Sequence, residues 1–163
     1  MTGTGTYAGI ERLTDATWWK AKQTALSDYI SLEAMQSMYG DLTDGEERPD
    51  IIVTTQDVWD DLWELLTPIQ RATSGQRSID YGFRMIEFNG TPVVVDAQCT
   101  AGYMYFLNSR YLNLYPLAGY EDPKWTGFKE PLNQDMIVGQ FIFKGNILCT
   151  NCRYQGKMTG ITT

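Results

Sequence analysis

The chain has 163 residues, of which 43% are hydrophobic and 13% aromatic, and its formal net charge is −7. This length fits one domain and this composition excludes general disorder, while no apolar run reaches the roughly 18 residues of a membrane span. The acidic balance argues against binding to nucleic acid through phosphate contacts. The lack of histidine removes Ser-His and Cys-His catalysis and the commonest ligand of transition metals.

Residues 2–30 form a glycine- and threonine-rich start that contains the pair Trp18 and Trp19. Adjacent tryptophans can stack on a base or a sugar, but a stacking surface for nucleic acid also needs clustered basic side chains, which this segment lacks. We therefore expect an irregular segment that its aromatic side chains pin to a core.

A helix is predicted from Ser31, which has the side chain of an N-cap, to Gly40, which is expected to end it. The apolar residues with the three-and-four spacing of one buried stripe are Leu32, Met35, Met38 and Tyr39. The polar run 41–49 is predicted to be a solvated connecting loop.

Residues 50–54 predict a short buried strand that leads directly into a second helix. Thr54 and Asp57 have the spacing of a capping box at the start of this helix, and Pro68 is expected to stop it. The apolar face of the helix consists of Val58, Leu62, Leu65 and Leu66, with Trp59 and Trp63 beside it. A strand that feeds a capped helix is one half of an α/β layer.

Residues 67–82 predict a surface loop that is long enough to suggest a contact with a partner. A phosphate-binding loop is not indicated, because neither GxGxxG nor GxxxxGK[ST] occurs. The residues of the predicted contact loop are Arg71, Ser74, Gly75, Gln76 and Arg77.

Three consecutive strands are predicted between Phe83 and Asn108, and they form a meander. Asn89-Gly90 predicts a tight hairpin turn, since both residues tolerate positive φ. The β-branched run 93–95 is too apolar for a strand with one wet face, so we expect both of its faces to be covered.

Beyond the meander, residues 111–115 alternate as a strand does, and residues 116–131 predict an irregular segment rich in aromatic side chains. Two further strands, at 136–143 and 146–153, are predicted to be joined by a tight turn at Lys144-Gly145. We expect the polar last ten residues to fray or to pair with a neighbouring chain.

The three cysteines form no recognisable site. Cys149 and Cys152 have the C-x-x-C spacing of redox and zinc sites, but zinc needs four ligands and Cys99 is the one cysteine left. A redox pair lies at the start of a helix, whereas these two follow a predicted strand. We expect reduced cysteines, with no metal and no other cofactor.

Several phrases, in order along nearly the whole chain, resemble the major capsid proteins of tailed bacteriophages and prophages with the HK97-type shell fold. The phrases are GIERLTDATWW, PDIIVTTQDVWDDL, FNGTPVVVD, GYMYFLNSRYLNL, TGFKEPLNQD and GNILCTNCRYQG. The N-terminal arm, extended loop and spine helix of that family find no match here. We therefore expect the C-terminal portion of such a protein, cut for expression rather than left as a prophage remnant.

The resemblance implies an α+β fold, in which a mixed central sheet is flanked by two or three helices and followed by long C-terminal strands. It implies three regions along the chain. Residues 1–30 follow the spine-helix region, residues 31–130 form a core like the axial domain of the family, and residues 131–163 return toward its peripheral domain.

The implied function is that of a structural subunit of an icosahedral capsid shell, which associates with identical subunits into pentamers and hexamers. The resemblance implies assembly in the bacterial host cytoplasm and a place in the virion, without specific binding to nucleic acid, membranes or small molecules. The alternative is a small acidic module that binds carbohydrate or peptide through exposed tryptophans.

An enzyme is not expected, because the chain has no recognisable constellation of catalytic residues. A hydrolase without histidine could use a pair of carboxylates. The candidates for such a pair are Asp57, Asp60, Asp61, Glu64, Asp96 and Asp135. The first four are more simply the solvated face of a helix.

Overall fold

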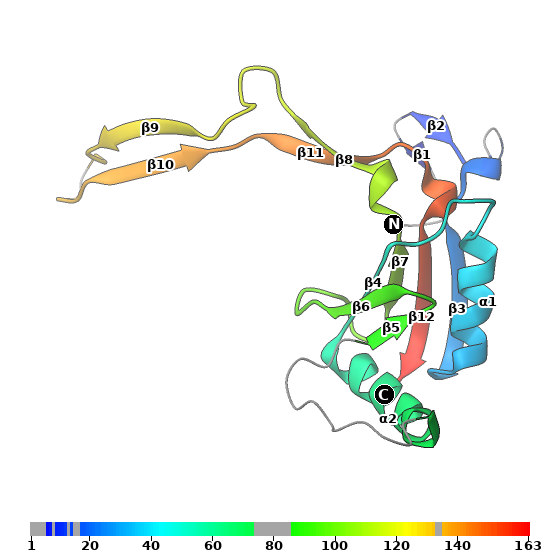
Figure 1. Cartoon of the computed structure of the whole chain (residues 1–163). Helices are drawn as coiled ribbons and strands as arrows, with labels where there is room; N and C mark the ends of the chain where they lie inside the picture. The colour runs from blue at the N-terminus through cyan, green and yellow to red at the C-terminus, as the bar shows by residue number, and fades with distance from the viewer. Residues whose placement is uncertain (1–5, 8, 13, 15–16, 74–85, 133–134) are drawn as a thin grey trace. The chain divides into compact units, whose positions relative to one another are not determined.

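The computed structural model describes the chain except for residues 1–5, 8, 13, 15–16, 74–85 and 133–134 (Figure 1). The chain divides into two compact units. Residues 1–111 and 151–163 form the first, which we call the sheet unit, and residues 112–150 form the second, which we call the ribbon unit. Among the residues that the structure describes, no helix is long and apolar enough to cross a membrane.

The sheet unit contains a six-stranded mixed sheet with the strand order β3-β12-β7-β4-β6-β5. The strands are β3 (Lys22–Tyr29), β4 (Ile51–Thr54), β5 (Ile86–Phe88), β6 (Thr91–Val95), β7 (Met104–Leu107) and β12 (Gly156–Thr162). The pairs β3/β12 and β4/β6 are parallel, and the remaining neighbours are antiparallel. Figure 1 shows β3 and β12, far apart in the sequence, side by side. The prediction of a mixed central sheet in an α+β fold is confirmed.

Two helices, α1 (Leu32–Leu42) and α2 (Gln56–Thr73), pack on one face of this sheet. Ile52 on β4 lies opposite Phe106 on β7 and Val93 on β6, so these side chains point to the same face. They belong to a single buried cluster with Met35 of α1 and Leu62 of α2. The helices and the sheet therefore share one hydrophobic core.

Shorter elements complete the sheet unit. A small hairpin joins β1 (Thr6–Tyr7) to β2 (Ile10–Glu11), and three single-turn 3-10 helices lie at η1 (Thr17–Trp19), η2 (Ser109–Tyr111) and η3 (Cys152–Tyr154). Trp19 packs edge-on against Tyr7 with 5.7 Å between the ring centroids, while Trp18 is 68% exposed. Trp18 therefore does not pin the segment to the core, and the prediction is wrong for that residue.

Two local predictions are confirmed. The Ser31 side chain caps α1, because its Oγ accepts a hydrogen bond from the Ala34 N–H at 3.2 Å. Asn89 and Gly90 both have positive φ, 50° and 78°, and they form the two-residue turn between β5 and β6.

Both predicted helix ends are wrong. Helix α1 continues through Gly40 to Leu42, whose side chain is 1% exposed in the core, and burial of this residue outweighs the weak helix propensity of glycine. Helix α2 runs through Pro68 to Thr73. A proline removes one main-chain hydrogen bond from a helix without preventing the residues beyond it from being helical.

The predicted capping role of Thr54 is also wrong. The Thr54 hydroxyl is fully buried and donates to the Tyr103 carbonyl oxygen at 3.0 Å, which ties β4 to the chain just before β7. Helix α2 begins only at Gln56. The Thr54 side chain therefore stabilises the sheet rather than the start of the helix.

The strand order departs from the predicted meander. Strands β5 and β6 are neighbours, but β4 lies between β6 and β7. The second face of β6 is also less covered than expected, since Val94 is 41% exposed while Val93 is buried. The β-branched run therefore has one buried face and one partly solvent-exposed face.

The two ends of the chain are more regular than predicted. Residues 22–29, expected to be irregular, form the edge strand β3. The last residues form β12, which lies between β3 and β7 and buries Met158 and Ile161. The expectation that the C-terminus frays or pairs with another chain is wrong, because β12 has a neighbour within this chain on both sides.

A buried polar pair holds the start of β12 against the end of β7. The Gln155 side chain is 1% exposed; its Oε1 accepts from the Asn108 N–H at 3.0 Å and its Nε2 donates to the Asn108 carbonyl at 2.9 Å. The Asn108 side chain in turn donates to Glu47 Oε2 and to the Arg48 carbonyl. The loop 41–49 is thus tied to the sheet rather than only solvated.

The ribbon unit consists of two antiparallel strand pairs. Strand β8 (Leu112–Pro116) pairs with β11 (Gly145–Cys149), and β9 (Lys124–Lys129) pairs with β10 (Val138–Ile142). Residues 116–131 are therefore not irregular throughout, because they include β9. The predicted turn at Lys144-Gly145 is wrong too, since β10 and β11 pair with different partners and the chain reverses between β9 and β10 instead. Figure 1 shows the two pairs following each other along the unit.

Candidate functional site

The ribbon unit has almost no core of its own. Among the residues that the structure describes between 112 and 150, Cys149 is the one buried residue. An isolated two-stranded ribbon is at best marginally stable in water, because it has no second layer against which to bury its apolar side chains. The unit therefore needs a surface that covers it.

The ribbon unit exposes many large apolar side chains. Those at least 45% exposed are Leu114, Tyr115, Leu117, Trp125, Phe128, Leu132, Met136, Ile137, Phe141, Phe143 and Ile147. Exposed apolar surface of this extent often marks protein interfaces or other binding sites. The ribbon is therefore the strongest candidate for a functional surface in the described part of the chain.

Three aromatic side chains gather on one face of the β9/β10 pair. Trp125 lies directly across from Phe141, with 4.7 Å between the ring centroids, and Phe128 packs edge-on against Trp125 at 5.3 Å. We call the surface of Trp125, Phe128 and Phe141 the aromatic face.

A β-bulge and a glycine make this arrangement possible. Two residues of β9, Thr126 and Gly127, oppose the single residue Gln140 of β10, and Gly127 has φ of 75°. The extra residue brings Trp125 and Phe128, three positions apart, to the same face. The Trp125 ring lies over Gly139, where a β-carbon would come within 2.0 Å of the ring.

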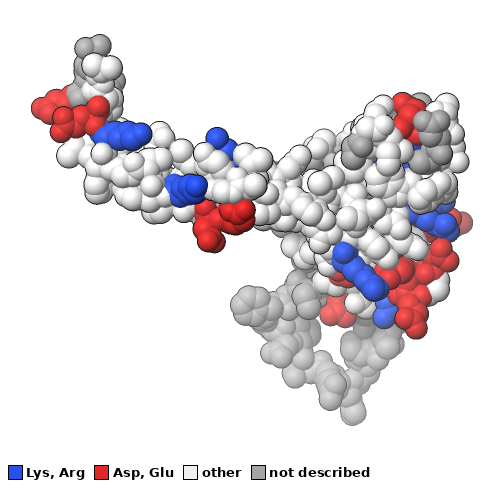
Figure 2. All heavy atoms as spheres, turned by 90° about the horizontal axis from the view of Figure 1, so that it is seen from above, with Lys and Arg blue, Asp and Glu red and all other residues white. Residues whose placement is uncertain are grey.

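The opposite face of the same strand pair carries positive charge. Lys124 precedes Trp125 in β9, and Lys129 follows Phe128. By the alternation of a strand, both lysine side chains point away from the aromatic face. The Lys124 and Lys144 ammonium groups both lie within 5 Å of the centroid of the Tyr120 ring, at 4.9 and 4.6 Å. Figure 2 shows basic side chains spaced along the ribbon, with acidic ones between them and at its end.

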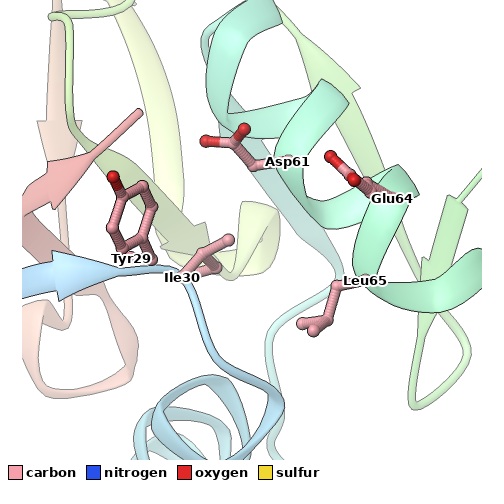
Figure 3. A pocket seen from close by; sticks show the side chains of 5 residues that line it. All are labelled: Tyr29, Ile30, Asp61, Glu64 and Leu65. Atoms are coloured by element: carbon pink, nitrogen blue, oxygen red, sulfur yellow. The ribbon is translucent and has the colours of Figure 1, made fainter.

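A second candidate is a pocket of about 470 Å³ on the sheet unit. Figure 3 shows Tyr29 and Ile30, at the end of β3, facing Asp61, Glu64 and Leu65 of α2 across it. The Asp61 Oδ2 atom is buried and has no hydrogen-bond partner among the described residues. The pocket brings two of the predicted carboxylates together, and its other described lining residues are Tyr29, Ile30 and Leu65.

The other predicted carboxylates lie elsewhere. Asp96 follows β6 and holds a turn, in which its Oδ1 accepts from the Gln98 N–H and its carbonyl from the Cys99 N–H. Asp135 lines a separate pocket of the ribbon unit with Glu130, Met136 and Ile137. The structure therefore gathers no larger carboxylate site among the described residues.

The predicted contact loop falls mostly outside the described residues. The loop residues that lie outside the described part of the chain are Ser74, Gly75, Gln76 and Arg77. The backbone of Arg71 lies in helix α2, which runs to Thr73, rather than in a loop. Its role as a contact stays a prediction.

The cysteines belong to no metal site in the part of the chain that the structure describes. Cys149 and Cys152 are buried, and no group of three potential metal ligands occurs among the described residues. Burial, and next the nearby Asp96 carboxylate, raise the pKa of the Cys99 thiol above its ordinary value. Trp59 and Trp63 stack in parallel at 5.6 Å and pack against the core, as predicted for core residues.

The sequence contains no regular strand pattern that would indicate the aromatic face. Trp125 and Phe128 stand three positions apart in the sequence, because the extra residue at Gly127 interrupts the alternation of β9. The bulge hid the period of two on which strand prediction depends. Trp125 and Phe128 therefore fall in the predicted irregular segment 116–131, whereas Phe141 falls in the predicted strand 136–143.

Comparison with known proteins finds relatives by structure. No family model matches the chain, and neither does any curated protein sequence. A chain in the capsid asymmetric unit of cyanophage A-1(L) matches 99% of this chain with a TM-score of 0.67 and 18% sequence identity. A chain in the procapsid of satellite phage P4, a structure that includes the size determination protein Sid, matches 99% with a TM-score of 0.55 and 14% identity.

These likenesses show the fold. The chain has the fold found in phage capsid structures, which confirms the resemblance drawn from the sequence. It spans about half the length of these neighbours, 56% of the cyanophage chain and 46% of the P4 chain.

Proposed function

We propose that this chain is a structural, non-enzymatic subunit, or part of one, of the icosahedral capsid shell of a phage or prophage. The observation that carries the proposal is the fold, which matches the cyanophage capsid chain over 99% of the present sequence. The ribbon unit supports it independently, because a ribbon without a core and with large exposed apolar side chains suits a subunit that is completed by its neighbours.

The finer parts of the proposal follow the sequence resemblance. The shell belongs to the HK97 type, the subunits associate into pentamers and hexamers, and they assemble in the bacterial host cytoplasm before entering the virion. A net charge of −7 is consistent with a wall that does not adhere to packaged nucleic acid. The partners are identical subunits.

The regional assignment is part of the proposal as well. Residues 1–30 follow a spine-helix region, residues 31–130 form a core like the axial domain, and residues 131–163 lead back toward a peripheral domain. This assignment needs its own test, because the two compact units divide the chain after residues 111 and 150. Gold labels on single introduced cysteines, located in images of assembled particles, would place each region relative to the capsomer axis.

The predicted contact loop is proposed to touch a neighbouring subunit near a symmetry axis. Arg71 and Arg77 would supply its charge. Crosslinking mass spectrometry of assembled particles is expected to join residues 67–82 to another subunit. If this loop is accessible and forms no intersubunit crosslink, the contact is elsewhere.

The capsid proposal is tested by the size of the native species. An induced lysate is sedimented, and the fractions are probed with an antibody raised against this chain. The expected signal lies in megadalton particles and sits on a polypeptide longer than 163 residues. A species that stays near 18.5 kDa and never enters particles contradicts the proposal.

A further inference from the structure

We propose that the pocket between the end of β3 and helix α2 binds a primary ammonium group on an aliphatic stem, as in a lysine side chain or a free alkylamine. The described residues that line this pocket all belong to the sheet unit, and they are Tyr29, Ile30, Asp61, Glu64 and Leu65. The proposal goes beyond the capsid function and does not depend on it.

The two walls of the pocket are held in place by the core. Asp61, Glu64 and Leu65 are spaced three and four positions apart on α2, so they lie on one side of the helix. Ile30 is 6% exposed and belongs to the buried cluster, and the main chain of Tyr29 is fixed by pairing with β12. The helix wall therefore faces a sheet wall across the pocket, as Figure 3 shows.

The Asp61 carboxylate is the first observation that points to a ligand. Its Oδ2 atom is buried and has no hydrogen-bond partner among the described residues. A carboxylate oxygen that has lost water without gaining a donor is unfavourable. Because Oδ2 is closed to water, a ligand in the pocket would contact the carboxylate at Oδ1, or at Oδ2 after rotation about χ2, and its positive charge would compensate the carboxylate in either case.

The second observation is the unbalanced charge of the pocket. Asp61 and Glu64 both line it, and neither takes part in a salt bridge among the described residues. Carboxylates three positions apart on a helix are neighbours, and like charges at such spacing are destabilising. A cation beside both carboxylates would replace this repulsion by attraction.

The polar part of the ligand follows from the oxygen atoms that the pocket offers. A divalent metal ion prefers six or more oxygen ligands, and no group of three potential metal ligands occurs among the described residues. An ammonium group has three N–H donors, and the oxygen-bearing side chains of the lining are likewise three: Tyr29, Asp61 and Glu64. The ring of Tyr29 also attracts a cation.

The apolar part of the ligand follows from Ile30 and Leu65. The volume of about 470 Å³ is larger than an ammonium group needs, so it also has room for an aliphatic stem. Leu65 is 38% exposed, and a stem that lies along it would remove this apolar surface from water. Lysine side chains bind in this way, with the stem on apolar surface and the charged group among polar partners.

The test titrates the 163-residue chain with n-butylamine at constant ionic strength and follows the amide signals by NMR. We expect saturable shifts at the lining residues, with a dissociation constant in the millimolar range because the ligand is small. 1-Butanol has the same stem without the charge and should bind about tenfold more weakly or less. Equal binding of the alcohol would overturn the proposal, as would the lack of any saturable shift.

Matched substitutions locate the charge that the amine recognises. Asp61→Asn and Glu64→Gln each remove one carboxylate from the pocket and should weaken the binding of butylamine by about fivefold or more. Asp41→Asn makes the same change of charge at an exposed position in the last turn of α1 and should change the affinity by less than about twofold. Equal weakening by all three would mean that the amine responds to net charge alone, which contradicts a site.

Unfolding in urea gives a second readout, which keeps the test decisive if Asp61→Asn alters the fold. A ligand that binds the folded chain raises the urea midpoint, so butylamine should raise that of the wild type more than that of Glu64→Gln, whose position is exposed. Without the amine, Asp61→Asn should unfold at the same urea concentration or a higher one, because it removes an unpaired charge. A clearly lower midpoint would show that the carboxylate is already satisfied in the free chain, and would overturn the proposal.

The source of the ammonium group is identified in the native protein. A carbodiimide joins a carboxylate to an amine in direct contact with it, and mass spectrometry finds the link. A link from Asp61 or Glu64 to a lysine of another polypeptide identifies a protein partner, whereas butylamine binding without such a link identifies a free amine. Neither result bears on whether the native protein enters particles, so the capsid proposal stands or fails separately.

Discussion

The sheet unit and the ribbon unit use the same kinds of side chain in opposite ways. Phe106 is fully buried between helices and sheet, whereas Phe141 is 74% exposed on a two-stranded ribbon. Fourteen buried residues form one cluster in the sheet unit, while the described part of the ribbon unit buries Cys149 alone. The difference is the number of layers. The sheet has helices over one face, whereas the described residues of the ribbon unit form no second layer over its aromatic face.

This contrast indicates that the two units differ in how they are stabilised. The sheet unit can be stable by itself, because its apolar side chains are already removed from water. The ribbon unit gains that stabilisation only where another surface covers its apolar side chains. Substitutions in the sheet unit should therefore change the free energy of unfolding, whereas substitutions in the ribbon unit should change association with another surface.

The largest effect is expected from a matched pair of phenylalanine truncations. Phe106→Ala should lower the free energy of unfolding by about 3–5 kcal/mol, because it removes a buried ring and leaves a cavity. Phe141→Ala should change it by less than about 0.5 kcal/mol, because the ring is mostly in water. Urea titrations of dilute chain measure both. Equal losses would mean that the ribbon has a core in the isolated chain.

A smaller loss is expected from the buried polar pair of the sheet unit. Gln155→Ala leaves the buried Asn108 N–H without its acceptor and should cost about 2–3 kcal/mol. The control is Gln140→Ala, which removes the same side chain from an exposed position of the ribbon unit and should be close to neutral. Thermal and urea unfolding report the difference. A neutral Gln155→Ala would show that water replaces the lost acceptor.

The helix cap gives a more modest effect. Ser31→Ala removes the acceptor of the Ala34 N–H and should destabilise the chain by about 1 kcal/mol. Ser37→Ala, at an exposed position inside α1, is the matched control and should be neutral or slightly stabilising, because alanine is the better helix former. A comparable loss for both serines would contradict the capping role.

A small effect on unfolding is expected at Gly139. A β-carbon there collides with the Trp125 ring, which must move, but the ring is on an exposed surface and the unfolding free energy should change by less than about 1 kcal/mol. In the proton spectrum of the five tryptophan indoles, one signal should shift in Gly139→Ala and none in Gln140→Ala. An unchanged spectrum would mean that Trp125 does not lie over Gly139 in solution.

The parts of the fold that depend on neighbouring residues could be predicted from the sequence. The Ser31 cap and the Asn89-Gly90 turn are decided by side chains within a few residues, and both are as predicted. The strand order was not predictable in this way, because β4 comes between β6 and β7 through pairing with residues about 40 and 50 positions away. Likewise, the polar C-terminal segment becomes a strand because β3 and β7 flank it.

The candidate site was harder to predict than the fold. The contact loop chosen from Arg71 to Arg77 was favoured by its length and its turn residues, whereas the aromatic face depends on a bulge at Gly127 that breaks the alternation of a strand. The exposure of Trp125 and Phe141 could not be read from the sequence, because aromatic residues in a strand are usually buried. They form a surface because the described residues supply no second layer over them.

The most direct test of the contrast between the two units is amide hydrogen exchange, measured on dilute free chain and on assembled particles. The account predicts that β4, β7 and β12 are protected in both samples, and that residues 112–150 are protected only in the particles. Equal and strong protection of residues 112–150 in the dilute free chain would show that the ribbon is stable without a partner, and would contradict the account.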